Sequence, residues 1–141
     1  MNTAMAYRQI HHTADIGLEI TADTAAALFS EAATGMFSII VSGEVAGAVD
    51  TRDIRVQADD WEGLLVAWLR ELLYLWHDKG LRFCRVLNWE ATDHDIAATV
   101  SVDRFDAGIH IVDSEIKAVT YHQITVKTDG TRWQGRVIFD I

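Results

Sequence analysis

The last quarter of the chain, from Glu115 to Ile141, consists of two alternating segments that meet at Asp129-Gly130. Alternation places successive side chains on opposite faces of an extended strand. The Asp-Gly dipeptide tolerates the positive φ angles of a two-residue type I′ turn. This stretch therefore predicts a long antiparallel hairpin, and any fold of the chain has to accommodate it.

A two-residue turn would also fix which residues of the hairpin face each other. Thr128 would then lie opposite Thr131, and Val119 would lie opposite Asp140. Lys117 would fall one diagonal step from Asp140 on the same face, within about 8 Å by sheet geometry. A bulge between Val119 and the turn would change this arrangement, because a one-residue slip moves every side chain beyond it to the other face.

The end of the sequence gathers negative charge. Ile141 carries a free α-carboxylate next to the Asp140 side chain, and two carboxylates about 5 Å apart repel by about 3 kcal/mol at an effective dielectric of 20. A divalent cation would relieve this repulsion, and oxygen ligands suit calcium or magnesium better than zinc. A solvated acidic terminus with Lys117 and Arg136 as loose neighbours explains the same residues, so spacing alone leaves both readings open.

The remaining sequence predicts a single α+β domain over residues 1–141, with two main helices and a largely antiparallel sheet. One helix is expected from Asp23 or Thr24 to Ile40, and a second, leucine- and tryptophan-rich helix from Asp59 or Asp60 to Gly80. The tryptophan stripe of the second helix is interpreted as core packing. Further strands are expected at residues 7–10, 17–22, 51–57, 83–91 and 96–102, and residues 104–113 are interpreted as a connection.

Charge and composition narrow the function. The formal net charge of −9 argues against direct binding of a nucleic-acid backbone, which needs clustered Lys and Arg. Cys84 is the only cysteine, which fits a reducing compartment. The longest apolar run, Leu64 to Trp76, is too short to span a bilayer and is interrupted by Arg70 and Glu71. We therefore expect a cytoplasmic protein that has no membrane partner.

Two clusters of polar residues are candidates for chemistry. His11, His12 and Asp15 are close in sequence but match no standard zinc spacing. A second acidic stretch is interpreted as a solvated loop; it contains Asp103, Asp106, His110 and Asp113. The sequence has no phosphate-binding glycine loop, dinucleotide fingerprint or nucleophile elbow. A metal-dependent hydrolase using His12 and Asp15 and a small-molecule-binding module with an apolar cavity beneath the sheet remain as alternatives.

Three blocks of the sequence, taken in order, resemble the archease family. They are HHTADIGLEI near the start, LLVAWLRELLYLW in the middle, and EIKAVTYHQITV with a terminal FDI. The resemblance implies an SHS2-type α+β fold carrying an inserted element. It also implies a non-catalytic accessory protein of the GTP-dependent RNA ligase that joins 3′-phosphate or 2′,3′-cyclic phosphate ends to 5′-hydroxyl ends in tRNA splicing and RNA repair. Members of the family promote guanylylation of the ligase histidine and permit multiple turnover.

The resemblance also assigns residues. Asp15 matches the aspartate of the family's HTAD motif, Lys117 the lysine of EIKA, and Asp140 the penultimate aspartate. It implies that Asp15, Asp140 and the carboxylate of Ile141 bind a divalent cation, calcium in family members, with magnesium or manganese as alternatives. Lys117 and His12 are then the residues expected to act toward the partner. His11 departs from the family pattern, which more often has an acidic residue there.

Overall fold

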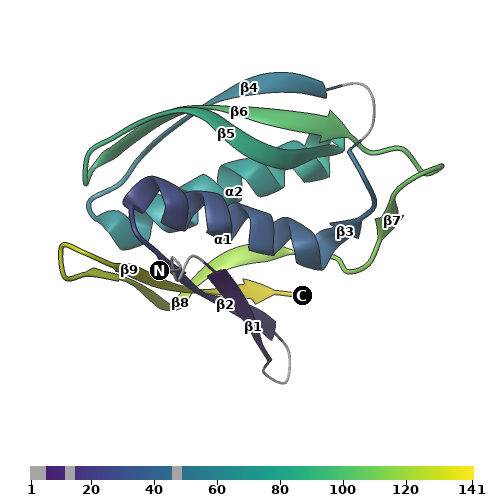
Figure 1. Cartoon of the computed structure of the whole chain (residues 1–141). Coiled ribbons are helices and arrows are strands. Elements are labelled where there is room, and N and C mark those ends of the chain that lie inside the picture. The colour runs from purple at the N-terminus through teal and green to yellow at the C-terminus, as the bar shows by residue number, and fades with distance from the viewer. Residues whose placement is uncertain (1–5, 12–14, 46–48) are drawn as a thin grey trace.

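The computed structural model describes residues 6–11, 15–45 and 49–141 (Figure 1). Two long helices and nine strands make up this part of the chain. In chain order they are β1 (Ala6–His11), β2 (Asp15–Ala22), α1 (Ala25–Ile40), β3 (Val41–Ser42), β4 (Val49–Gln57), α2 (Trp61–Lys79), β5 (Leu81–Ala91), β6 (Asp95–Arg104), β7 (Ile111–Val112), β8 (Ala118–Thr128) and β9 (Trp133–Asp140).

The strands form three antiparallel sheets, which confirms the predicted α+β class. A four-stranded sheet has the order β1-β2-β9-β8, a three-stranded sheet has the order β4-β6-β5, and β3 pairs with β7. The two helices lie between the four-stranded and three-stranded sheets (Figure 1). Each of these two sheets therefore has one face against the helices and one face turned outward. Neither helix in the described part of the chain is long and apolar enough to cross a membrane.

Both helices begin with a side-chain cap and bury an apolar face. Thr24 Oγ1 accepts a hydrogen bond from the Ala27 amide at 3.0 Å, and Asp60 Oδ1 accepts one from the Gly63 amide at 2.8 Å. Trp68 is fully buried on α2, and its indole nitrogen donates to the Phe29 carbonyl of α1 at 3.0 Å. The tryptophan stripe is therefore core packing, as the sequence predicted.

The turn of the C-terminal hairpin differs from the predicted type I′ turn. Thr128 pairs with Trp133, so four residues rather than two connect β8 to β9. Asp129 Oδ1 closes this loop by accepting hydrogen bonds from the Thr131 hydroxyl at 2.7 Å and from the Thr131 and Arg132 amides at 2.9 Å each. Gly130 has a φ of 92°, whereas Asp129 is not among the residues with positive φ. The bonds to Asp129 thus favour a wider loop than the dipeptide predicted.

A bulge in β8 changes the register a second time. Thr125 pairs with Arg136, but the next pair along is Thr120 with Ile138, and Gln123 between them has a φ of 55°. The predicted pairing of Val119 with Asp140 is therefore wrong, because Ala118 occupies that position. Long bulges of this kind depend on contacts across the sheet, and local alternation does not reveal them.

Gly17 permits a close approach beside the start of β2. A Cβ atom at this position would lie 2.7 Å from Ile138 Cδ1, 2.9 Å from Ile10 Cγ1 and 2.9 Å from the Val137 carbonyl oxygen. Ile138 is only 1% exposed although its partner Gly17 lies on the outer face of the sheet. Both isoleucines reach over the glycine from the strands on either side of it, so the close packing of the three strands depends on the missing side chain.

We expect Gly17→Ala to lower the free energy of unfolding by about 1–3 kcal/mol, because the new methyl group has to displace a backbone carbonyl as well as side chains. Gly135→Ala in β9 is the matched control, because its nearest contacts would be at 3.4 Å. Urea unfolding of both variants measures the difference. Equal stability of the two variants would contradict the close-approach argument.

The Asp129 loop predicts a pH dependence. Hydrogen bonds from the Thr131 hydroxyl and amide and from the Arg132 amide lower the pKa of Asp129 from 3.8 to about 2. A depressed pKa contributes stability that is present above the unfolded value and is lost as the pH falls through the folded value. Asp129→Ala should therefore lower the urea midpoint at pH 7, and its difference from wild type should shrink between about pH 4 and pH 2. A difference that is independent of pH in this range would refute the assignment.

Candidate functional site

Asp15 and Asp140, far apart in the sequence, are opposite each other in the four-stranded sheet. Asp15 is the first residue of β2, Asp140 is the last residue of β9, and the two are Cα partners. The end of β9, which closes the sequence, lies beside β2 (Figure 1). Side chains of directly paired residues share a face of the sheet, with Cβ atoms about 4.5–5.5 Å apart. Backbone pairing thus brings two carboxylates together.

The two carboxylates have different surroundings. Asp15 Oδ1 is buried and has no hydrogen-bond partner within the part of the chain that the structure describes. Asp140 is exposed, and Ile141 beside it is 44% exposed. Leaving a buried polar atom unsatisfied costs about 1–3 kcal/mol, and more for a charged group. An oxygen-preferring cation at this position would satisfy the Asp15 oxygen and reduce the repulsion between the two carboxylates.

Lys117 lies next to this pair, but not in the predicted position. Its backbone amide donates to the Asp140 carbonyl at 2.7 Å. Because Ala118 pairs with Asp140, alternation puts Ala118 rather than Lys117 on the face of the Asp140 side chain. The Lys117 side chain is exposed and forms no ion pair within 4.0 Å among the described residues. The backbone of Lys117 is therefore next to the acidic pair, and its ammonium group has no ion-pair partner among the described residues.

The two histidines of the predicted site lie at and just beyond the end of β1. His11 is the last residue of β1 and pairs with Ile16. His12 lies outside the described residues. Within those residues, no group of three or more His, Cys, Asp or Glu side chains could hold a metal ion. The acidic pair would thus need main-chain oxygens or further ligands from elsewhere to complete a cation site.

Helix α2 holds the strand that leads to Lys117, through residues that the sequence analysis did not single out. Strand β8 is an edge strand, and Arg70 donates from Nε and Nη2 to its Val119 carbonyl at 3.1 Å each. His77 Nε2 lies 2.9 Å from the Ile116 carbonyl just before the strand. Arg70 and His77 are seven residues apart, so they share one helix face. The only feature of the sequence that could have indicated this contact is the seven-residue spacing of two polar residues within an otherwise apolar helix.

A row of charged and polar side chains crosses the outer face of the same sheet. Glu19 of β2 lies between Arg8 of β1 and Arg136 of β9, and it pairs with both. Arg136 also donates to Gln123 of the β8 bulge at 3.1 Å. Arg136 and Arg8 together hold the pKa of Glu19 below its usual value. Glu19 is four residues from Asp15 on the same face of β2, so this row braces the sheet beside the acidic pair.

The second acidic stretch is not the solvated loop that the sequence suggested, because two of its members are buried. Asp103 is fully buried, and Arg82 binds its two carboxylate oxygens at 3.0 and 2.9 Å. His110 is 4% exposed, and its Nε2 lies 2.7 Å from the Glu44 carbonyl. Arg82 and Asp103 are partners across β5 and β6. Local sequence does not reveal this long-range pairing. The buried Arg82–Asp103 ion pair links β5 to β6 and therefore has a structural role.

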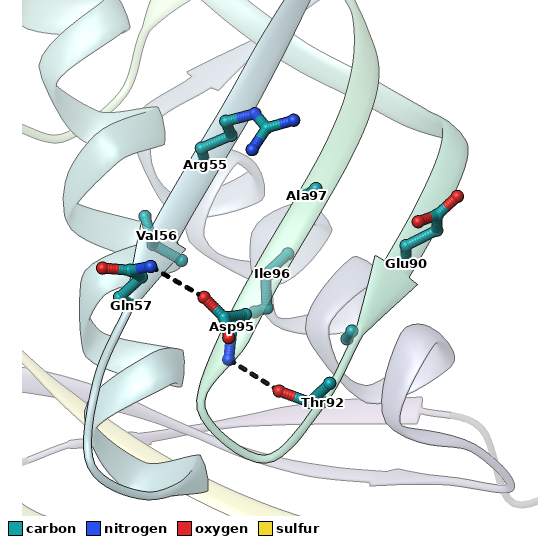
Figure 2. Close-up of a pocket in the computed structure, with 9 residues that line it drawn as sticks. Arg55, Val56, Gln57, Glu90, Thr92, Asp95, Ile96 and Ala97 are labelled. Atoms are coloured by element: carbon teal, nitrogen blue, oxygen red, sulfur yellow. Dashed lines mark hydrogen bonds between the residues drawn. The ribbon is translucent and has the colours of Figure 1, made fainter.

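A cavity of about 600 Å³ lies at one end of the three-stranded sheet (Figure 2). Arg55 and Gln57 of β4 and Glu90 of β5 contribute polar side chains to it, and Gln57 donates to Asp95 at 2.9 Å. Its lining mixes these polar side chains with the apolar side chains of Val56, Ala91, Ile96 and Ala97, whereas the small-molecule-binding module requires an apolar cavity beneath the sheet. The cavity is also built on a different sheet from the Asp15–Asp140 pair.

Comparison with known proteins gives a consistent result. Residues 7–141 match the model of the archease protein family. The protein archease of Methanosarcina acetivorans is 34% identical over 140 residues, covering 96% of this chain and 95% of its own length. Protein 1598 of Methanobacterium thermoautotrophicum has a solution structure with a TM-score of 0.73 and 27% identity, covering 96% of this chain and 99% of its own. An archease of Thermotoga maritima, described as a possible chaperone, has a TM-score of 0.64 at 22% identity, covering 95% of this chain and 96% of its own.

Proposed function

The chain belongs to the archease family, and on that premise we propose that it is a non-catalytic accessory protein that activates the GTP-dependent 3′-phosphate/5′-hydroxyl RNA ligase. In this proposal it promotes guanylylation of the ligase and multiple turnover in tRNA splicing or RNA repair. The observation that carries the proposal is the pairing of Asp15 with Asp140, where a buried carboxylate oxygen has no hydrogen-bond partner in the part of the chain that the structure describes. The description of the Thermotoga maritima relative as a possible chaperone is compatible with an accessory role.

Asp15, Asp140 and the main-chain carboxylate of Ile141 are proposed to hold a divalent cation. The donor set consists of oxygens only, which favours calcium, with magnesium or manganese as alternatives. When bound at a phosphoryl-transfer site, such a cation would neutralise phosphate charge. The side chain of Asp15 would orient the site from β2, and Asp140 would do so from β9, on a sheet fixed by Gly17.

Lys117 and His12 are proposed to act toward the ligase. Lys117 is exposed beside the acidic pair. It would balance the negative charge of Asp15, Asp140 and the Ile141 carboxylate when this end of the sheet enters the ligase active site. The net charge of −9 makes contact with the protein partner more favourable than direct contact with RNA. We place this activity in the cytoplasm, without a membrane partner. An autonomous hydrolase using His12 and Asp15 would instead show turnover by the purified protein alone.

We expect divalent cations to stabilise the protein through Asp15. At a free calcium concentration about 100 times the dissociation constant, binding to the folded state should add about 2.7 kcal/mol. Asp15→Asn should lose most of this gain and, in chelator, should be at least as stable as wild type, because it removes the negative charge of a half-buried side chain whose Oδ1 atom has no partner among the described residues. Asp93→Asn, in an exposed turn, is the control. Thermal unfolding with calcium and with chelator measures both effects, and an equal calcium shift in Asp15→Asn and wild type would rule out this site.

We expect Asp140→Ala to abolish stimulation of ligase guanylylation while leaving the fold intact, because Asp140 is exposed at the end of β9. Radiolabelled GTP transfer to the cognate ligase, with and without the variant, measures the loss. Asp93→Ala should stimulate like wild type. A short extension after Ile141 should also impair stimulation by displacing the carboxylate. Full stimulation by Asp140→Ala would remove the proposal.

A further inference from the structure

Four large apolar side chains are exposed at the end of the molecule where β3 pairs with β7. We call this set the apolar ridge; it comprises Val45 (54% exposed), Ile109 (48%), Ile111 (66%) and Val112 (51%). Three of the four lie within one connection, between β6 and β8. Single exposed apolar residues are normal, whereas several at one end of a molecule are typical of an interaction surface. Ile111 and Val112 follow each other in β7 and therefore point to opposite faces of this strand, so the ridge presents apolar side chains on both of its sides.

Hydrogen bonds fix the ridge in its exposed position. Val112 and Ile111 pair with Val41 and Ser42 in the two-stranded sheet, and the Asp113 amide donates to the Ile40 carbonyl at 2.8 Å. His110 anchors both sides of the ridge. Its Nδ1 accepts from the Asp106 amide at 2.8 Å, and its Nε2 lies 2.7 Å from the carbonyl of Glu44, which precedes Val45. A surface held in this way loses little conformational entropy when a partner binds.

The ridge borders a cavity that can receive an apolar side chain. Val112 lines a cavity of about 330 Å³ together with Trp76 of α2 and Phe105 of the connection. Trp76 and Phe105 stack edge to face with ring centroids 5.8 Å apart. Glu115 and His77 also line this cavity. The site therefore combines an apolar wall with an acidic edge.

The ridge and the acidic pair are close enough for one partner surface to cover both. Val112 is five residues from Lys117, so their Cα atoms are at most about 18 Å apart. The Lys117 amide bonds to the Asp140 carbonyl. A standard interface buries about 800 Å² on each partner, which corresponds to a disc about 32 Å across.

Charge distinguishes among the partners that could cover the ridge. Asp106, Asp113 and Glu115 are exposed within the same connection, and Glu44 is exposed beside Val45. A second copy of this chain would bring these carboxylates and a net charge of −9 against the same charges, and an anionic membrane would also be repelled. A protein surface with apolar side chains among Lys and Arg residues is complementary to the ridge.

We infer that the apolar ridge is the docking surface for the ligase and presents its apolar side chains to a basic-flanked apolar patch on that partner. This inference rests on the proposed function. The ridge supplies affinity for the ligase, whereas the Asp15–Asp140 pair stimulates guanylylation of the ligase. The two surfaces are therefore separable by substitution, although one interface covers both.

The test measures affinity and activation separately, using the purified full-length chain and the cognate ligase. Biolayer interferometry gives the dissociation constant, and guanylylation at saturating accessory protein gives the maximal stimulation. Ile111→Asp should weaken binding by about tenfold or more, as expected for a central apolar contact, and maximal stimulation should stay within about twofold of wild type. Leu87→Asp is the matched control, because Leu87 is 45% exposed in the second bulge of β5 and should bind like wild type.

A second pair of variants tests the sign of the partner's charge. Asp113→Lys and Asp93→Lys change the net charge equally, but only Asp113 lies beside the ridge. Asp113→Lys should weaken binding and flatten its salt dependence, and Asp93→Lys should do neither. Equal binding by Ile111→Asp and wild type would overturn the ridge, as would a wild-type dimer in sedimentation that Ile111→Asp dissociates.

The outcomes also separate the ridge from the proposed function. Stimulation by wild type together with undiminished binding by Ile111→Asp overturns the ridge alone. Binding by wild type that Ile111→Asp weakens, without any stimulation of guanylylation, supports the ridge and overturns the activating role. The absence of both binding and stimulation in wild type overturns both.

Discussion

The antiparallel pairing of β2 with β9 is the constraint on which the candidate site depends. It sets Asp15 opposite Asp140, although 125 positions separate them in the sequence. The register is supported close to the site by Gly17, over which Ile10 and Ile138 both reach, and further along by the row from Arg8 through Glu19 to Arg136. The ladder therefore imposes the proximity of two carboxylates that would otherwise repel each other. At this position the Asp15 Oδ1 atom is buried without a hydrogen-bond partner among residues 6–11, 15–45 and 49–141.

The outer strand of the sheet depends on helix α2 in the same way. Strand β8 has β9 on one side only, and Arg70 and His77 take the place of a further strand by bonding to backbone carbonyls of the Ile116–Val119 segment. That segment carries Lys117 and follows the connection that bears the apolar ridge. The acidic pair and the apolar ridge thus adjoin a segment that is hydrogen-bonded to α2, and α2 is itself tightly packed in the core.

The sequence predicted those features that depend on local periodicity and on motif matches. It predicted both helices, most of the strands, the core role of Trp68 and the meeting of Asp15 with Asp140, the last through family resemblance. It did not predict the four-residue loop at Asp129 or the bulge at Gln123, because side-chain bonds in the folded state decide the register there. It also misread Asp103 and His110 as solvated, because their burial depends on Arg82 in a neighbouring strand. The polar character of Asp103 and His110 predicted that they are exposed, whereas their ion pairs and hydrogen bonds in the folded protein allow them to be buried.

The central claim is that Asp15 and Asp140 share one divalent cation. Crystals grown with manganese and measured at its absorption edge would test this directly, because anomalous scattering locates the ion independently of the phasing model. The account predicts an anomalous peak within the bonding distance of hard divalent cations, about 2.0–2.6 Å, of oxygens from both carboxylates. Well-ordered density for both aspartates without a peak between them, or with the ion bound elsewhere, would contradict it.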